Sequence, residues 1–176
     1  MSGNPGLSTA VLALGNLMHT DDGVGIHAMR RLLESSRLPP NVQAIEGGTL
    51  GLDLLPRLEG MTYLLALDAV DVGAVPGTLS RFRNRDLSAL PTAKSVHLLG
   101  FSDLLSALRL LGQAPDEVVL LGIQPESTDW GVELTPSVGA ALDSLLEATL
   151  SQLAGWAEGE AKRMTQTATS AAARQT

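Results

Sequence analysis

Residues 63–68 have the sequence Tyr-Leu-Leu-Ala-Leu-Asp, and this stretch decides the fold. Five residues in a row without polar alternation predict a strand that is buried on both faces. Such a strand belongs at the centre of a parallel sheet that has helices on each side. The run ends in Asp68, a carboxylate that is costly to bury without a cation or a hydrogen-bond donor. We therefore predict an α/β fold and treat Asp68 as a candidate functional residue.

On either side of this strand, short apolar runs alternate with amphipathic stretches, as they do in βαβ units. We predict further strands at 10–14, 42–45, 78–82 and 118–123, and helices at 25–34, 50–58, 101–111 and 136–156. The loop before 78–82 is shorter than the roughly dozen residues of a parallel crossover, so this strand should be antiparallel and at an edge. The expected architecture is a single three-layer sandwich: a mostly parallel five-stranded sheet with one antiparallel edge strand and helices on both faces.

The composition changes along the chain of 176 residues. Overall, 44% of the residues are hydrophobic, which suits one globular domain with a substantial core. After Glu158 the chain is dominated by Thr, Ser, Ala and Gln and has little to bury. We therefore predict a folded domain over residues 1–158 and a disordered tail over residues 159–176.

Charge and residue usage exclude several classes of function. The net charge of −7 has no Lys/Arg cluster to offset it, so the surface repels phosphate backbones and nucleic-acid binding is not expected. The absence of cysteine excludes disulfides, thiolate zinc sites and cysteine nucleophiles, and it fits a reducing compartment. Residues 1–8 do not read as a secretory signal, and no apolar run approaches the roughly 20 residues of a membrane span. We expect a cytoplasmic protein that does not associate with membranes.

Polar residues cluster where the predicted parallel strands end. Open parallel sheets bind ligands beyond the carboxyl ends of their strands. The residues expected at that edge are Asp21 and Asp22, Glu46 with Gly47 and Gly48, Asp68, and Gln124 with Glu126; His97 is expected in the loop before the 101–111 helix. Two carboxylates and one imidazole that converge there would bind a divalent ion such as nickel or zinc and leave positions open for a further ligand.

Each of these residues also has a structural interpretation. Either aspartate of the pair at 21–22 would serve as a helix cap, and Asp68 would serve as a turn former. His97 would be an ordinary loop histidine, and the two glycines at 47–48 would make a tight turn. The chain contains no His-Glu-x-x-His, Gly-x-Ser-x-Gly, P-loop or Gly-x-Gly-x-x-Gly motif that would decide the chemistry locally.

Five blocks of sequence, in order and with compatible spacing between about residues 10 and 153, resemble the hydrogenase maturation protease family. They are LGNLMHTDDGVG at 14–25; EGGTLGLDLL at 46–55; LDAV at 67–70 with PGT at 76–78; SVH at 95–97 with FSDLL at 101–105; and LGIQPES at 121–127 with Trp130. Two positions depart from the family pattern. Ala13 stands where Gly is frequent, and Glu46 stands where Asp is frequent, which should alter substrate choice.

The resemblance implies an endopeptidase that removes the C-terminal extension of a nickel-iron hydrogenase large-subunit precursor after nickel insertion. The family's metal-contacting positions match Asp22, Asp68 and His97. The nickel is then supplied by the substrate, and no organic cofactor is expected. Asp22 and Asp68 are also the candidate catalytic residues: one acts as a general base on water, while the nickel or a protonated carboxyl polarises the carbonyl. Glu46, Gly47 and Gly48 are candidates for substrate recognition, and we expect a monomer whose partner is the precursor.

Two alternatives belong to other functional classes. A receiver-like phosphoacceptor domain would use Asp68 and a lysine such as Lys94, but a receiver's lysine should follow the last strand, and Lys94 precedes a helix and another strand. A nucleotide-binding module would use Gly15 and Gly25 at the first strand-to-helix turn. The carboxylates at that turn would repel a pyrophosphate, which needs bare amides at a helix start.

Overall fold

A computed structural model describes residues 8–89 and 96–173 of the chain. In chain order, with η marking 3-10 helices, the elements are β1 (Thr9–Leu14), η1 (Thr20–Gly23), α1 (Val24–Glu34), β2 (Val42–Gly48), η2 (Gly51–Leu54), α2 (Leu55–Leu58), β3 (Tyr63–Ala69), β4 (Leu79–Arg83), η3 (Asn84–Ala89), α3 (Val96–Leu110), β5 (Glu117–Ile123) and α4 (Pro136–Ala173). In this part of the chain, no helix combines the length and the apolarity that crossing a membrane would require.

The five strands form one sheet in the order β2-β1-β3-β5-β4. The first four are parallel, and β4 is antiparallel to β5 at the edge. Every residue of β3 is buried, as the apolar run at 63–67 predicted. The register sets Ala13, Leu67 and Leu121 side by side across the three inner strands. The predicted fold class, with its central buried strand and its antiparallel edge strand, is confirmed.

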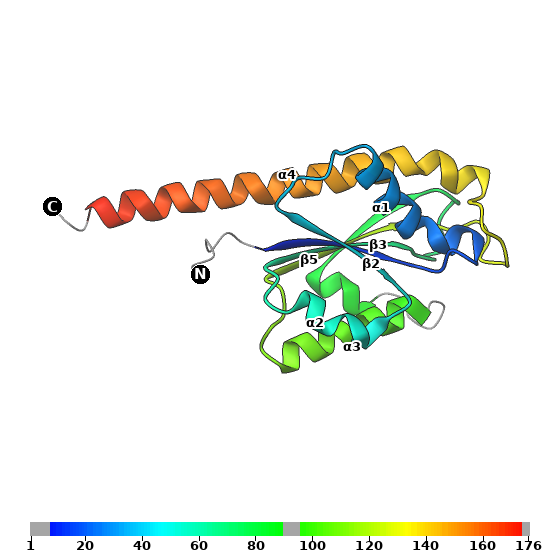
Figure 1. The fold of residues 1–176 in the computed structure, drawn as a ribbon, viewed down its shortest axis with the longest axis horizontal. Coiled ribbons are helices and arrows are strands. Elements are labelled where there is room, and N and C mark those ends of the chain that lie inside the picture. The colour runs from blue at the N-terminus through cyan, green and yellow to red at the C-terminus, as the bar shows by residue number, and fades with distance from the viewer. Residues whose placement is uncertain (1–7, 90–95, 174–176) are drawn as a thin grey trace.

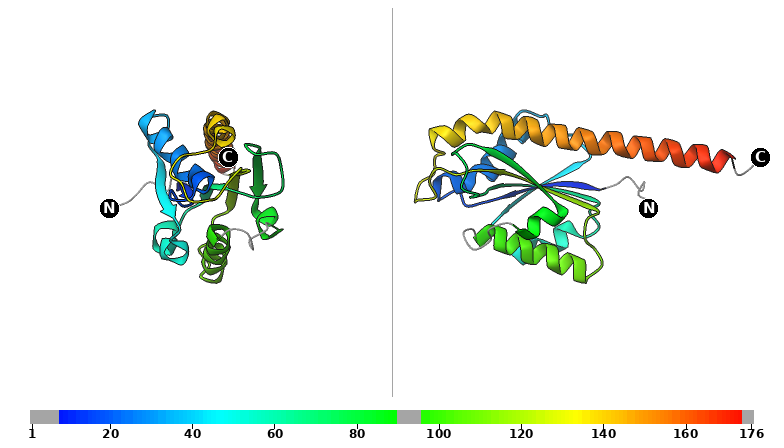
Figure 2. Two further views of the ribbon diagram at one scale, coloured as in Figure 1. Left: turned by 90° about the vertical axis from the view of Figure 1, so that its right-hand side faces the viewer. Right: turned by 180° about the vertical axis from the view of Figure 1, so that it is seen from behind.

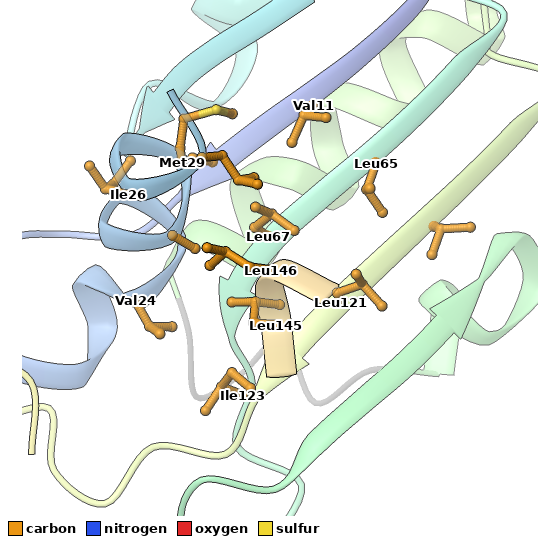
Figure 3. Close-up of a cluster of buried hydrophobic side chains, with 14 of the residues drawn as sticks. Val11, Val24, Ile26, Met29, Leu65, Leu67, Leu121, Ile123, Leu145 and Leu146 are labelled. Carbon is orange, nitrogen blue, oxygen red and sulfur yellow. The ribbon is translucent and has the colours of Figure 1, made fainter. Parts of the chain in front are cut away.

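Helices cover both faces of the sheet and separate two hydrophobic cores (Figures 1 and 2). Helices α1 and α4 pack on one face, and α2 and α3 pack on the other. Figure 3 shows the first core, where Met29 of α1 lies near Val11 and Leu67 of the sheet. The buried side of α1 follows from apolar residues at helical spacing: Ile26, Met29 and Leu32. Each fully buried side chain of this kind contributes roughly 1.5–3 kcal/mol.

Helix α3 begins earlier than predicted, at Val96 instead of residue 101, so His97 lies in its first turn and not in a loop. Gly100 lies just before the predicted start, and glycine disfavours helix interiors. Packing overrides that preference: the apolar stripe starts at Leu98 and continues through Phe101, and both side chains are buried. At Gly100 a Cβ would lie 3.3 Å from Cα of Gly51, so the missing side chain permits close packing against η2.

Helix α4 also differs from its prediction, because it continues to Ala173 and does not end near Trp156. It projects past the end of the sheet in Figure 1. Residues 159–173 are therefore helical where their composition predicted a disordered segment; residues 174–176 lie outside the described chain. This stretch has too few apolar residues to form a hydrophobic core, but its Ala, Glu, Lys, Arg and Gln residues have high helix propensity. A division between domain and tail at residue 158 stays a prediction.

Candidate active site

Asp68 is the deepest polar residue of the site. It lies within β3, one residue beyond the apolar run, and its side chain is fully buried. One carboxyl oxygen, Oδ1, accepts a hydrogen bond from the amide of Ala69 at 2.8 Å, while Oδ2 has no partner. Burial raises the pKa of Asp68 to about 8; the nearby charge of Asp22 also raises it, whereas His97 and the Ala69 amide oppose the shift. Burial therefore favours the protonated form of this carboxyl group.

Asp22 and His97 form a hydrogen-bonded pair beside it. Nε2 of His97 lies 2.6 Å from Oδ2 of Asp22, and the side chains are 9% and 15% exposed. The same aspartate oxygen accepts from the amide of Asn16 at 3.2 Å. Burial lowers the pKa of His97, but the hydrogen bond and charge of Asp22, together with the charge of Asp68, outweigh burial and raise the pKa above 6.5. The hydrogen bond to the negatively charged Asp22 is by itself a sufficient reason for the pKa of His97 to be raised.

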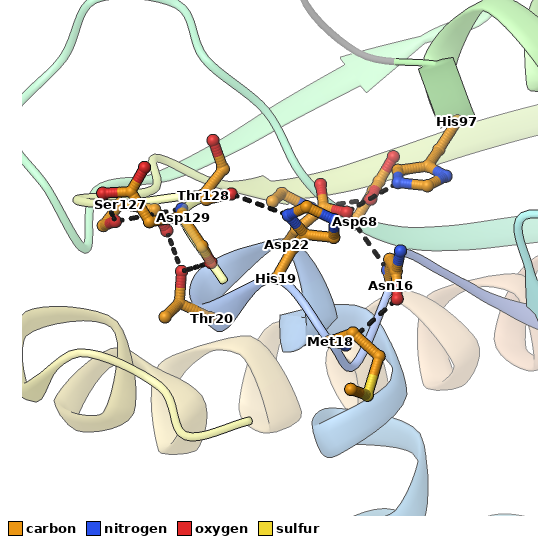
Figure 4. A network of polar contacts seen from close by, with 11 residues as sticks. Asn16, Met18, His19, Thr20, Asp22, Asp68, His97, Ser127, Thr128 and Asp129 are labelled. Carbon is orange, nitrogen blue, oxygen red and sulfur yellow. Dashed lines mark hydrogen bonds and ion pairs between the residues drawn. The ribbon is translucent and has the colours of Figure 1, made fainter. Parts of the chain in front are cut away.

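Asp22, Asp68 and His97 converge from three separate elements, η1, β3 and α3 (Figure 4). The edge expected from the strand ends therefore does assemble these three side chains. His97 and Asp22 contact each other, and Asp68 lies near enough to feel the charge of both. The three do not surround an open cage: among the described residues, no group of three His, Asp or Glu side chains is spaced to hold a metal ion as it stands. An ion would have to replace the contact between His97 and Asp22.

Two glycines permit this approach. Gly15 has φ of 121°, and a Cβ there would lie 1.9 Å from the carbonyl oxygen of Asp22. A Cβ at Gly25 would lie 2.3 Å from the carbonyl oxygen of Leu67. Any larger residue would push η1 and α1 away from the ends of β1 and β3. The glycines of the first block therefore place Asp22 next to Asp68.

Asp21 has a role that the sequence did not reveal. Its side chain is fully buried and accepts hydrogen bonds from the amides of Glu126, Ser127 and Thr135 and from the hydroxyl of Thr135. It thus fastens the loop after β5 to η1. The helix-cap interpretation is wrong for both aspartates, because the N-cap of α1 is Gly23 and it makes no side-chain cap bond. The position of the two adjacent aspartates after the first strand did not distinguish the loop anchor from the site residue; only the family resemblance selected Asp22.

Glu46, Gly47 and Gly48 lie beside the cluster but outside it. They line an open groove of about 360 Å³ together with Gly15, Asn16, Leu17, Ile26, Thr49 and Leu50. Both carboxylate oxygens of Glu46 accept from Arg30, at 3.1 and 3.2 Å. The groove reaches the site through Asn16, whose amide donates to Asp22.

The two polar residues expected after β5 do not join the cluster. Oε1 of Gln124 accepts from the amides of Val72 and Ala74 and so holds the loop before β4. Glu126 accepts from the hydroxyl of Ser137 at 2.6 Å, near the start of α4. These residues shape the loops around the site, and three side chains, not four or five, meet at its centre.

The model of the hydrogenase maturation protease family matches residues 26–152, which is most of the chain. The chain belongs to this family. The matched region contains Asp68 and His97, whereas Asp22 lies just before it. The protease is similar over 83% of its length to the hydrogenase expression/formation protein HupD of Rhodobacter capsulatus, with 40% identity and 71% of that relative covered. It is 38% identical to the hydrogenase 2 maturation protease of Escherichia coli over 81% of this chain and 88% of the relative.

Solved structures agree with this assignment. The hydrogenase maturating endopeptidase HybD of Escherichia coli superposes on the protease with a TM-score of 0.79 and 34% identity, covering 85% of this chain and 93% of the other. The [NiFe] hydrogenase maturation protease HybD of Thermococcus kodakarensis gives 0.69 and 26%, with 83% and 99% covered. The chain is thus an endopeptidase of hydrogenase maturation.

The family assignment replaces the two alternative interpretations. Lys94, which a receiver would need, lies outside the described residues. The turn after β1 is also unsuited to a pyrophosphate, because the amide of Asn16 is already bonded to Asp22. The maturation protease has its polar cluster where nucleotide-binding sheets would keep bare amides.

Proposed function

We propose that this protease removes the C-terminal extension of a nickel-iron hydrogenase large-subunit precursor after nickel insertion, and that Asp22, Asp68 and His97 recognise the nickel. The observation that carries the proposal is the buried Oδ2 of Asp68, which has no hydrogen-bond partner and lies beside the contact between Asp22 and His97. A buried carboxyl oxygen without a partner is costly, and a cation would relieve that cost.

The nickel belongs to the substrate in this proposal. Its arrival would separate His97 from Asp22 and leave one imidazole and two carboxylates free to contact it, a mixed nitrogen and oxygen set that suits nickel. Its positive charge would also lower the pKa of Asp68, which desolvation raises to about 8, so that nickel favours the carboxylate. A precursor without nickel would meet a closed, protonated site.

Cleavage would then use the same carboxylates. One of them accepts a proton from the attacking water, while the metal or a protonated carboxyl polarises the scissile carbonyl. With Asp68 ionised beside the nickel, the metal would polarise the carbonyl, and Asp22, which keeps an amide donor from Asn16, fits the base. The neighbouring groove bounded by Glu46, Gly47 and Gly48 would hold the peptide on one side of the scissile bond.

The test is cleavage of nickel-loaded and nickel-free precursor, with mass spectrometry of the released peptide. We expect the wild-type protein to cut only the nickel-loaded form. Asp68→Asn and His97→Ala should keep the fold but lower cleavage by about 100-fold or more. Asp103→Asn is the matched control: this exposed aspartate of α3 lies six residues from His97, and its loss should change nothing. Full cleavage by both site variants, or efficient cutting without nickel, would contradict the proposal.

A further inference from the structure

An exposed tryptophan next to the site has no role in the chemistry proposed above. The chain has two tryptophans; Trp156 is buried, whereas Trp130 is 77% exposed. It lies in the loop between β5 and α4, where Val132 is 60% exposed, and the adjoining segment before η1 carries Met18, which is 52% exposed. These three residues are called the Trp130 platform below.

The Trp130 platform is fixed in place. The amide of Thr20 donates to the carbonyl of Gly131 at 2.8 Å, and the amide of Gly131 donates to the carbonyl of Met18 at 3.0 Å. The His19 ring lies 4.5 Å from the Trp130 ring, and its Nδ1 is 3.0 Å from the carbonyl oxygen of Thr128. An exposed aromatic ring that is already ordered loses little conformational entropy when a partner covers it.

The Trp130 platform continues directly into the candidate active site. Thr20, which carries one of its hydrogen bonds, belongs to η1 together with Asp22. Figure 4 shows His19 and Thr20 lying between the loop at 127–129 and Asp22. The buried side chain of Asp21 also ties the same loop to η1, through hydrogen bonds to loop amides. A molecule that covers Trp130 would therefore also lie next to the candidate active site.

Both chain segments that form the Trp130 platform lack positively charged side chains. No Lys or Arg occurs in residues 1–29 or 110–161, and these stretches include both segments of the platform. The loop itself carries three carboxylates: Glu126, Asp129 and Glu133. Since complementary partners match both the apolar centre and the charged rim, the fitting surface is an apolar patch bordered by basic side chains.

We infer that the Trp130 platform is the docking surface for the precursor protein, which presents such a patch beside its nickel site. This inference rests on the proposed function, and it adds a binding contact that is separate from the bonds made and broken at Asp22 and Asp68. Truncation of a central aromatic residue of an interface weakens binding strongly, whereas contacts at the edge matter little. Trp130 is the central residue here.

The first test reads the contact directly. The enzyme is labelled with 5-fluorotryptophan, which gives two ¹⁹F signals that Trp130→Phe assigns, and unlabelled nickel-loaded precursor from the same organism is added. The Trp130 signal should shift on binding while that of buried Trp156 stays in place. An unchanged Trp130 signal in a formed complex would overturn the inference. So would an equal shift on concentrating the enzyme alone, because the occupant would then be a second copy of this chain.

The second test separates docking from chemistry. Trp130→Ala should raise the KM for the nickel-loaded precursor at least tenfold and leave kcat nearly unchanged, and Trp130→Phe should restore most of the loss. Leu110→Ala is the matched control, since this leucine is 89% exposed at the end of α3 and has no link to the platform. Unchanged KM in Trp130→Ala would reject docking and leave the proposed function standing. Full cleavage by both Asp68→Asn and His97→Ala would reject the proposed function and leave the ¹⁹F result valid.

Discussion

At the scale of single residues, three carboxylates of one edge have three different environments. Asp21 is buried and fully hydrogen-bonded, Asp22 is paired with a histidine, and Asp68 is buried with one oxygen unpartnered. The first arrangement stabilises a loop, whereas the other two leave capacity for a ligand. Burial alone therefore does not identify a functional carboxylate. A buried carboxylate with few hydrogen-bond donors around it is the better candidate for ligand binding.

The raised pKa of Asp68 makes stability depend on pH. Because the folded pKa of about 8 exceeds the ordinary 3.8, the folded protein binds the extra proton between these values. The stability from this group is complete below the lower value and is lost as pH rises through the higher one, by up to roughly 1.4 kcal/mol per pH unit. We expect Asp68→Asn to remove this slope, since its amide oxygen can still accept from Ala69.

Urea unfolding of both proteins at several pH values between 5 and 9 checks this expectation. The quantity to compare is the difference between the two free energies of unfolding, because the pH dependence of His97, which has the same sign, is present in both proteins and largely cancels. A constant difference across that range would show that Asp68 is ionised throughout.

At the scale of elements, the sequence was a good guide wherever apolar spacing set the structure. The buried β3 and the antiparallel β4 followed from an uninterrupted run and a short loop. The start of α3 was not predicted correctly. Glycine at position 100 disfavours a helix locally, but close packing of Gly100 against η2 favours the helix that forms there. Convergence of Asp22, Asp68 and His97 could be anticipated from strand ends, but the anchor role of Asp21 depends on Thr135, 114 residues away.

The extension of α4 supports a prediction about this element. Residues 161–166 are exposed, and Arg163 donates to the hydroxyl of Tyr63 over 3.3 Å. We expect a chain that ends at Glu158 to lose about 1 kcal/mol of stability, since a single partly buried hydrogen bond contributes about that much. Thermal unfolding should thus shift by only a few degrees, and cleavage of nickel-loaded precursor should be unaffected. A collapse of either property would place residues 159–173 within the domain.

At the scale of the whole molecule, charge is distributed unevenly along the fold. The chain carries −7 overall, yet nine of its twelve Lys and Arg residues fall between Arg30 and Arg109, both included. The segments at 15–23 and 124–135, which build the site and the Trp130 platform, contain only acidic charges. A one-sided field of this kind accelerates the approach of an oppositely charged surface without altering the contacts made afterwards.

Salt should therefore slow association and spare the chemical step. Raising NaCl from about 50 to 500 mM shortens the screening length from roughly 14 to 4 Å, so kcat/KM for the nickel-loaded precursor should fall several-fold while kcat holds. Glu133→Gln removes one exposed carboxylate beside the Trp130 platform. This variant should show a weaker dependence of kcat/KM on salt. Glu59→Gln, an exposed glutamate after α2, is the control that keeps the same net charge. If both variants had equal salt slopes, the rim would have no part in attracting the partner, and total charge would be responsible.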